Sequence, residues 1–357
     1  MAGLSGVAVA GAGAWVGAFL AWAERPGPLA ESAVLVVEPG RTLEGIARDL
    51  EAHAVIDDAL RFRWFARLRD AAGAIRAGEY RFEAAASPAR VLERLVTGEV
   101  VVHRLLILEG STVRDLLDLA AHAPGLARLL DGATPEDLFA RLGLGGGHAE
   151  GWFFPDTYHY VRGDTDADVL LRAHRRMRAV LAEAWAGRAP ELPYRDEREA
   201  LIVASIIEKE TGMPEHRARI GGVLVRRLTR GMPLQTDPTV IYGLGAAFDG
   251  DLTRAHLERD GPYNTYTRRG LPSTPIALPS RAAIEAALHP APGTALYFVA
   301  QGDGATWFSD TLREHNEAVR RFQRALSRGA GGGGGRRHPP PSTPRGRGGA
   351  GGPAAKT

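Results

Sequence analysis

One acidic residue, Glu208, directly follows a run of eight uncharged and mostly apolar residues, 200–207. Few of these eight residues favour turns, so the run predicts a buried helix. A carboxylate on a buried helix is either paired with a cation or used in chemistry, because burying it bare is costly. The following segment offers Arg219 and Arg226 as cations for such a pair.

Polar, aromatic and proline-rich segments follow the predicted helix, at residues 234–243, 262–267 and 270–280. They supply amides, hydroxyls and aromatic faces, and their prolines stiffen the backbone. A buried acid followed by such segments favours a site for a polyhydroxylated polymer, most simply a glycan.

The candidate substrate contacts are five residues of these segments and one acid that precedes them. They are Gln235, Thr236, Asp237, Asn264, Tyr266 and Glu150. A structural role in turns is an equal alternative for Gln235, Thr236, Asn264 and Tyr266. Glu150 reads equally well as a supporting acid or as a surface charge.

Helical spacing favours Glu208 over Glu210 as the reactive acid. Positions 201, 204, 205, 208 and 212 form one stripe, whose small residues beside Glu208 leave space for a substrate. Glu210 lies about 200° round the helix, next to Lys209. Desolvation on the apolar stripe favours a protonated carboxyl at Glu208 near neutral pH.

The first 23 residues carry no charged side chain. Residues 4–23 match the ~20 apolar residues that cross a bilayer, so they predict a single membrane anchor. One alternative is a cleaved signal peptide, because Ala21, Trp22 and Ala23 resemble a small-x-small cleavage site, and another is a buried helix of a soluble protein. The length of the segment and the absence of a basic start favour the anchor, although no orientation follows from charge.

The charge balance argues against nucleic acid as a partner. The net charge is +2, but residues 329–357 contribute five basic side chains and no acid, so the first 328 residues carry −3. A folded part without a basic bias does not favour nucleic-acid binding. Cysteine is absent, the histidines lack ligand spacing and no nucleotide-binding motif occurs, so the sequence predicts no metal site and no cofactor.

The expected fold class is α+β, with a single N-terminal transmembrane helix, a small LysM-like βααβ subdomain and a larger mixed α/β catalytic subdomain. The LysM likeness lies in a strand at 33–38, a helix capped by Thr42, a helix at 57–70 and a strand at 78–82; a plain spacer is an equal alternative. Further strands are predicted at 100–108, 295–300 and 306–308, and further helices at 88–95, 112–119, 165–185, 215–230 and 312–326. The expected divisions are an anchor and break at 1–28, the LysM-like subdomain at 29–110, a connecting region at 111–194, the catalytic subdomain at 195–328 and a disordered Gly/Pro/Arg tail at 329–357.

Five motifs recur in a characteristic order along the chain. They read Glu-Gly-Trp-Phe-Phe-Pro-Asp-Thr at 150–157, Ala-Ser-Ile-Ile-Glu-Lys-Glu-Thr at 204–211, Leu-Gln-Thr-Asp-Pro-Thr-Val-Ile-Tyr at 234–242, Tyr-Asn-Thr-Tyr at 263–266 and Gly-Leu-Pro at 270–272. Together they resemble the endolytic murein transglycosylases, the YceG-like family, over roughly residues 30–327.

The resemblance implies a bitopic enzyme that cuts nascent peptidoglycan strands and so terminates glycan elongation. In that family the first glutamate of the Glu-Lys-Glu-Thr sequence is catalytic, which is Glu208 here. The implied location is the cytoplasmic membrane, crossed once by residues 4–23, with the catalytic part on the outer, periplasmic face. Glycan strands are the implied substrate, and peptidoglycan synthases are left open as partners.

The implied reaction needs one carboxyl. Glu208 protonates the oxygen that links MurNAc to GlcNAc and then takes the proton of the MurNAc 6-hydroxyl, leaving a 1,6-anhydro-MurNAc end. A water-using muramidase is the alternative, and it needs a second carboxylate. Asp237 is the candidate, although an aspartate before a proline also reads as a helix N-cap. A non-catalytic peptidoglycan-binding scaffold is the third hypothesis.

Overall fold

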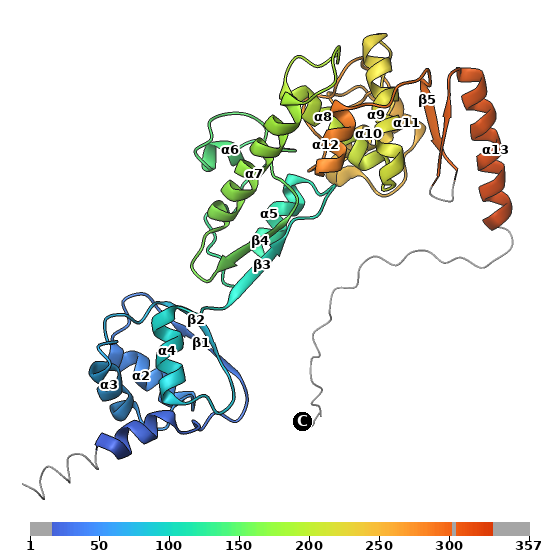
Figure 1. Ribbon diagram of the computed structural model, residues 1–357. Coiled ribbons are helices and arrows are strands. Elements are labelled where there is room, and N and C mark those ends of the chain that lie inside the picture. The colour runs from blue at the N-terminus through green and yellow to red at the C-terminus, as the bar shows by residue number, and fades with distance from the viewer. Residues whose placement is uncertain (1–15, 302–304, 331–357) are drawn as a thin grey trace, which may run out of the picture. The chain divides into compact units, whose positions relative to one another are not determined.

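Residues 16–301 and 305–330 are described by the computed structural model, and their side chains are described as far as Phe322. The chain divides into two compact units, Met1–Gly293 and Thr294–Thr357. The first unit contains strands β1 to β4 and helices α2 to α12, and the second contains β5, β6 and α13 (Figure 1). The class is therefore mixed helix and strand, as expected.

The first part of the larger unit is a strand–helix–helix–strand arrangement followed by one more helix. Its elements are β1 (Ala33–Val37), α2 (Leu43–Ala52), α3 (Ala59–Leu68), β2 (Gly78–Phe82) and α4 (Pro88–Thr97). β1 and β2 pair antiparallel, with Leu35 opposite Tyr80. The predicted order of these elements is confirmed.

Side-chain caps set the starts of these helices. Thr42, Asp58 and Ser87 each accept a hydrogen bond from a backbone N–H three residues further on. The apolar faces of the helices and of the strand pair then share one buried core, in which Phe62 and Tyr80 are among the largest side chains.

The end of the predicted anchor belongs to this core. Residues 16–24 are helical, and Trp22 and Ala23 are buried at 5% and 1% exposure. The indole Nε1 of Trp22 donates to Asp57 at 2.9 Å. Of the predicted anchor, residues 4–23, the part up to residue 15 lies outside the described residues. Among the residues that are described, no helix has both the length and the apolar character needed to cross a membrane.

A second antiparallel pair joins β3 (Val102–Leu106) to β4 (Thr157–Val161). The buried strand predicted at 100–108 forms, but Val102 and Leu106 are more than half exposed. An antiparallel pair can leave one face to solvent, so the expected burial of the whole strand is wrong. No element was predicted at β4, whose partner is far away in the sequence.

Three helices pack with this pair: α5 (Val113–Ala121), α6 (Leu138–Arg141) and α7 (Asp166–Ala186). Thr112 and Thr165 start α5 and α7 with reciprocal capping boxes, so of the two candidate caps for α5, Ser111 and Thr112, the structure selects Thr112.

The remaining helices of the larger unit include the predicted buried helix, α8, against which α9, α10 and α12 pack. They are α8 (Glu197–Glu210), α9 (Pro214–Thr229), α10 (Asp237–Leu244), the 3-10 turn η1 (Gly245–Ala247), α11 (Arg254–Glu258) and α12 (Arg281–Leu288). Residues 200–207 are each at most 1% exposed, so the buried helix is confirmed. α12 packs against α8, α9 and α7 (Figure 1).

The second unit is a strand pair and a helix, β5 (Tyr297–Ala300), β6 (Thr306–Ser309) and α13 (Leu312–Ala330). The two predicted strands form, and they pair with each other in the antiparallel direction. From residue 331 on, the predicted tail lies outside the described residues.

Candidate active site

The carboxylate of Glu208 is buried and has partners on both oxygens. Its side chain is 6% exposed, and Nη2 of Arg217 lies 3.2 Å from its Oε1. The backbone N–H of Ser280 donates to Oε2 at 2.9 Å, and the Ser280 hydroxyl donates to the same oxygen. Pairing with a cation is therefore confirmed, but Arg219 and Arg226 were the wrong candidates.

Ser280 links the acid to the start of α12. It is the N-cap of that helix, and its hydroxyl oxygen also accepts the N–H of Ala283 at 3.2 Å. The residue that begins α12 is thus also the residue that orients Glu208. The C-terminal end of α8 and the N-terminal end of α12 meet at this carboxylate.

The small residues beside Glu208 on α8 are covered by protein. Ser205 and Ala204 are fully buried, and the hydroxyl of Ser205 accepts the N–H of Ile276 at 3.0 Å. The expectation that these small residues leave space for a substrate is wrong, because the segment around Ile276 fills it.

A strained loop precedes α10. Gln235 has a φ of 53°, a left-handed conformation that is costly for a residue other than glycine. Buried Arg227 holds this loop, because its Nη1 donates to the carbonyls of Pro233 and Leu234 and to Oε1 of Gln235. The N–H of Gln235 donates to the Thr265 carbonyl at 3.0 Å. Gln235 is exposed at the tip of a loop whose conformation several bonds determine.

Asp237 is the first residue of α10 and does not cap it. The N-cap position belongs to Thr236, which makes no side-chain capping bond. The exposed carboxylate of Asp237 accepts a hydrogen bond from the hydroxyl of Tyr266 instead. The N-cap interpretation of Asp237 was therefore wrong.

Glu210 is the second acid of the Glu-Lys-Glu sequence, and it lies near the polar loops. Burial, together with the negative charge of Asp237, raises the pKa of Glu210 to about 8. Burial and the hydrogen bond to Asp237 also raise the pKa of Tyr266. The sequence singled out Glu208 alone, whereas the structure also places an acid with a raised pKa, Glu210, at the end of the same helix.

Thr236 and Asn264 are buried within the polar loops. The hydroxyl of Thr236 lies within hydrogen-bonding distance of the Thr265 hydroxyl. The amide nitrogen of Asn264 donates to backbone carbonyls between residues 256 and 259, and its oxygen accepts the N–H of Tyr266 at 2.8 Å. Both side chains have the structural turn role that was the alternative, and they shape the loops that carry the exposed residues.

Glu150 is fully buried, which excludes the alternative of a surface charge and favours a supporting acid. Its carboxylate accepts the N–H of Val113, the first residue of α5, at 3.0 and 3.2 Å, and the hydroxyl of Tyr242 at 2.9 Å. Burial raises the pKa of Glu150 to about 7, although these hydrogen bonds act in the opposite direction. The acid therefore joins the start of α5 to α10.

Three residues of the site were missed by the sequence interpretation. Arg217 follows a helix break, so helical spacing from Glu208 does not reveal the pair. Ser280 could have been found as an N-cap, because a serine precedes an alanine-rich helical segment. Arg227 gave no local signal, since its bonds go to a loop beyond the end of its own helix.

The described residues contain no group of three or more His, Cys, Asp or Glu side chains placed to hold a metal ion. The chemistry that this arrangement can perform is proton transfer by a buried carboxyl whose orientation is fixed by a cation and a serine.

Comparison with known proteins finds relatives that share one family name and one enzyme name. The profile of the YceG-like family matches residues 35–321. An endolytic murein transglycosylase of Bacillus subtilis (strain 168) is 28% identical over 306 residues, which cover 80% of this chain and 83% of the relative. An endolytic murein transglycosylase of Streptococcus pneumoniae serotype 2 is 26% identical over 322 residues, covering 79% of this chain but only 57% of the longer relative. A crystal structure of a YceG-like protein from Listeria monocytogenes aligns with a TM-score of 0.51 and 28% identity, over 81% of this chain and 99% of that one.

Proposed function

Because the chain belongs to the YceG-like family, we propose that it is an endolytic murein transglycosylase. It cuts the bond from MurNAc to GlcNAc inside a peptidoglycan strand and leaves a 1,6-anhydro-MurNAc end, which terminates elongation of that strand. The observation that carries the proposal is Glu208, a buried carboxylate held by Arg217 and Ser280 at the end of α8.

The chemistry requires Glu208 to carry a proton first and to accept one later. In the free protein Nη2 of Arg217 occupies the Oε1 side of the Glu208 carboxyl at 3.2 Å. The guanidinium therefore has to leave Oε1 before the acid step. Ser280 stays on Oε2 and keeps the carboxyl oriented. Once the proton has gone to the leaving oxygen, Arg217 can pair with the carboxylate again.

The proposed reaction is balanced without water. The bond between C1 of MurNAc and O4 of GlcNAc breaks as Glu208 gives its proton to O4. The 6-hydroxyl oxygen of the same MurNAc forms a bond to C1 and gives its proton to Glu208, which returns to its starting state. A muramidase would use water at C1 and need a second carboxylate about 5 Å, or about 6.5–9.5 Å, from the first. Asp237 is the candidate for that role.

We assign the substrate-facing role to the exposed and half-buried residues of the polar loops. Gln235, Asp237 and Tyr266 present an amide, a carboxylate and an aromatic ring at the protein surface. Thr236 and Asn264 support them through loop hydrogen bonds. Glu150 contributes indirectly, by fixing α10 through Tyr242.

The placement in the cell is a further part of the proposal. Residues 4–23 are the proposed attachment to the cytoplasmic membrane, although their last two residues, Trp22 and Ala23, pack in the protein core rather than in lipid. The catalytic part lies on the outer face, where membrane-bound peptidoglycan synthases are its proposed partners. The burial of Trp22 and Ala23 supports a retained segment, because cleavage after Ala23 would remove an indole from the core. Flotation of the full chain with lipid vesicles, and its loss when residues 1–15 are deleted, tests this placement.

The division of the chain is proposed on the same basis. Residues 29–110 form a LysM-like sugar-binding subdomain, which the strand–helix–helix–strand order supports. Residues 111–194 connect it to a catalytic subdomain at 195–328.

Shortening of purified, uncrosslinked glycan strands tests the catalytic assignment. Glu208→Gln is expected to lose about a hundredfold or more in rate, because an amide can neither give nor accept the proton. Glu210→Gln is the matched variant, two residues away on the same helix, and we expect it to lose less. The reverse ranking would move the catalytic role to Glu210. Strand binding without cleavage by the wild type would favour the scaffold hypothesis.

A further inference from the structure

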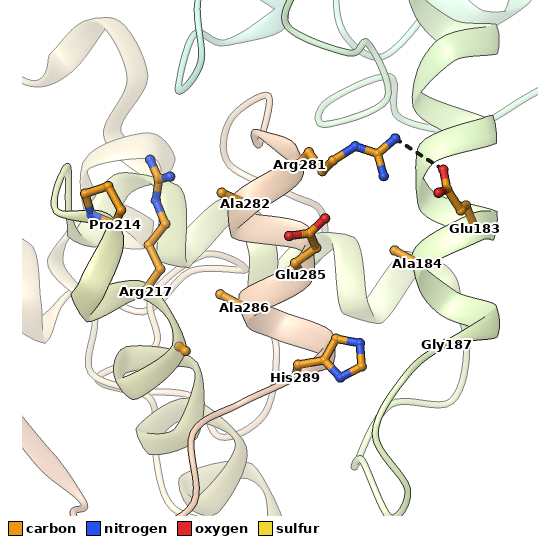
Figure 2. Close-up of a pocket in the computed structure, with 11 residues that line it drawn as sticks. Glu183, Ala184, Gly187, Pro214, Arg217, Arg281, Ala282, Glu285, Ala286 and His289 are labelled. Atoms are coloured by element: carbon orange, nitrogen blue, oxygen red, sulfur yellow. Dashed lines mark hydrogen bonds and ion pairs between the residues drawn. The ribbon is translucent and has the colours of Figure 1, made fainter.

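A groove of about 550 Å3 lies between α7, α9 and α12 (Figure 2). Its volume is within the range of about 300–1,000 Å3 that is usual for ligand sites. Five of its lining side chains are charged or titratable, and the others are proline, glycine and alanine. The five are Glu183, Arg217, Arg281, Glu285 and His289.

The groove adjoins the Glu208 carboxylate through two neighbouring groups. Arg217 lines the groove and also forms the ion pair with Glu208. Arg281 lines the groove and directly follows Ser280, the donor to the other oxygen of Glu208. Arg217 also has a buried Nε–H without an acceptor in the described part of the chain, so the protein satisfies this guanidinium incompletely. A ligand in the groove is therefore adjacent to the residue that must release Glu208.

The charges of the groove leave one acid without a partner. Arg217 is paired with Glu208. Arg281 is paired with Glu183 at 3.2 Å, as the dashed line in Figure 2 marks. Glu285 projects from the middle of α12 and is exposed. Within the described residues its carboxylate makes no ion pair or hydrogen bond. The groove therefore presents an unpaired negative charge above a lining of small side chains.

We propose that this groove binds the peptide stem of the MurNAc residue at the cleavage site, with Glu285 binding the free side-chain amine of the diamino acid in that peptide. This inference rests on the proposed transglycosylase function. The peptide is attached through a lactyl group at O3 of MurNAc, two ring carbons away from the C1 at which the bond breaks. It must therefore leave the sugar close to Glu208.

The lining suits an extended peptide. Alanine and glycine side chains allow a peptide backbone to approach α12 and α7 closely, whereas larger side chains would hold it away. The amine is positively charged, so it can form the ion pair that Glu285 does not form in the free protein. Cross-linking converts this amine to an amide and removes its charge. The groove thus distinguishes strands that have not yet been cross-linked from mature ones.

Three glycan substrates test the inference: strands with intact stems, strands whose stem amines have been acetylated, and strands freed of stems by an amidase. The rate of formation of new strand ends gives kcat/KM for each. For the full-length wild type we expect the intact stems to be preferred over the acetylated ones by about 1.5-fold to fivefold, the range of an exposed ion pair. Glu285→Gln is expected to bring that ratio to about one.

Glu215→Gln is the matched control, because Glu215 is an exposed acid of α9 that does not line the groove. The control should keep the wild-type preference. Equal rates of the wild type on intact and acetylated strands would overturn the inference and leave the proposed function standing. A preference that survives in Glu285→Gln would overturn the role of that residue. Failure of the wild type to cut any of the three substrates would contradict the proposed function itself.

Discussion

The buried acid Glu150 leads to a prediction about stability and pH. Replacing it by glutamine removes a titratable group but keeps an acceptor oxygen for the N–H of Val113. The other carboxylate oxygen becomes an amide NH2, which cannot accept a hydrogen bond. We expect this change to lower the free energy of unfolding by about 1 kcal/mol at every pH. Glu150→Gln should therefore be slightly less stable than the wild type in acid.

The sign of the pH effect follows from the direction of the shift. The ordinary pKa of the carboxyl is 4.5, and burial raises the pKa of Glu150 to about 7. Between these values the unfolded chain has lost the proton and the folded protein has kept it, so rising pH destabilises the wild type. At about 1.4 kcal/mol for each pH unit, the loss between pH 5 and pH 8 is roughly 2.5 kcal/mol. Glu150→Gln has no carboxyl at this position that can lose a proton, so its stability does not fall in this way. It should therefore be more stable than the wild type at pH 8.

Guanidinium unfolding at pH 5, 6, 7 and 8, followed by tryptophan fluorescence, measures the difference between the two proteins. The exposed Glu31 provides the control, since Glu31→Gln should follow the wild type across the whole range. A difference in the free energy of unfolding between the wild type and Glu150→Gln that stays constant from pH 5 to pH 8 would refute the reasoning. It would mean that Glu150 has the same pKa in the folded and unfolded states.

Three further changes have defined outcomes. Gly151→Ala places a Cβ 2.5 Å from Pro275 in a backbone with a φ of 85°, so we expect a loss of about 2–4 kcal/mol and a lower Tm in calorimetry. Tyr266→Phe removes the donor to Asp237, and kcat/KM on glycan strands should fall by about threefold to tenfold while Tm changes little; an unchanged rate would count against this pair. Trp22→Ala opens a cavity in the N-terminal core and should cost about 3–5 kcal/mol in the same calorimetric assay; a negligible loss would show that residues 16–24 do not pack there.

Local sequence signals predicted much of the fold. Thr42, Thr112 and Thr165 fixed the starts of three helices, because an N-cap depends on residues within one turn. The apolar run 200–207 predicted the buried helix for a similar reason, since its length and lack of charge are local properties. β4 escaped prediction, because its strand pairing with β3 depends on a distant segment.

The site was less predictable than the fold. Glu208 could be found because a lone acid at the end of an apolar helix requires an explanation. Its partners Arg217 and Ser280 lie on two other helices, and only the packing of α8, α9 and α12 brings them together. The misassignment of Asp237 as a cap has the same origin. The Asp-Pro pair predicted the start of a helix within one residue, but the tertiary contact with Tyr266 determines what the carboxylate does.

The direct test of the central claim is the chemistry of the new strand end. Purified, uncrosslinked glycan strands are incubated with the wild type and with Glu208→Gln in water labelled with heavy oxygen, and the product ends are analysed by mass spectrometry. The account predicts 1,6-anhydro-MurNAc ends that contain no label, formed by the wild type and not by the variant. Reducing MurNAc ends that carry the label would contradict it and would establish a muramidase, with Asp237 as the second carboxylate to examine.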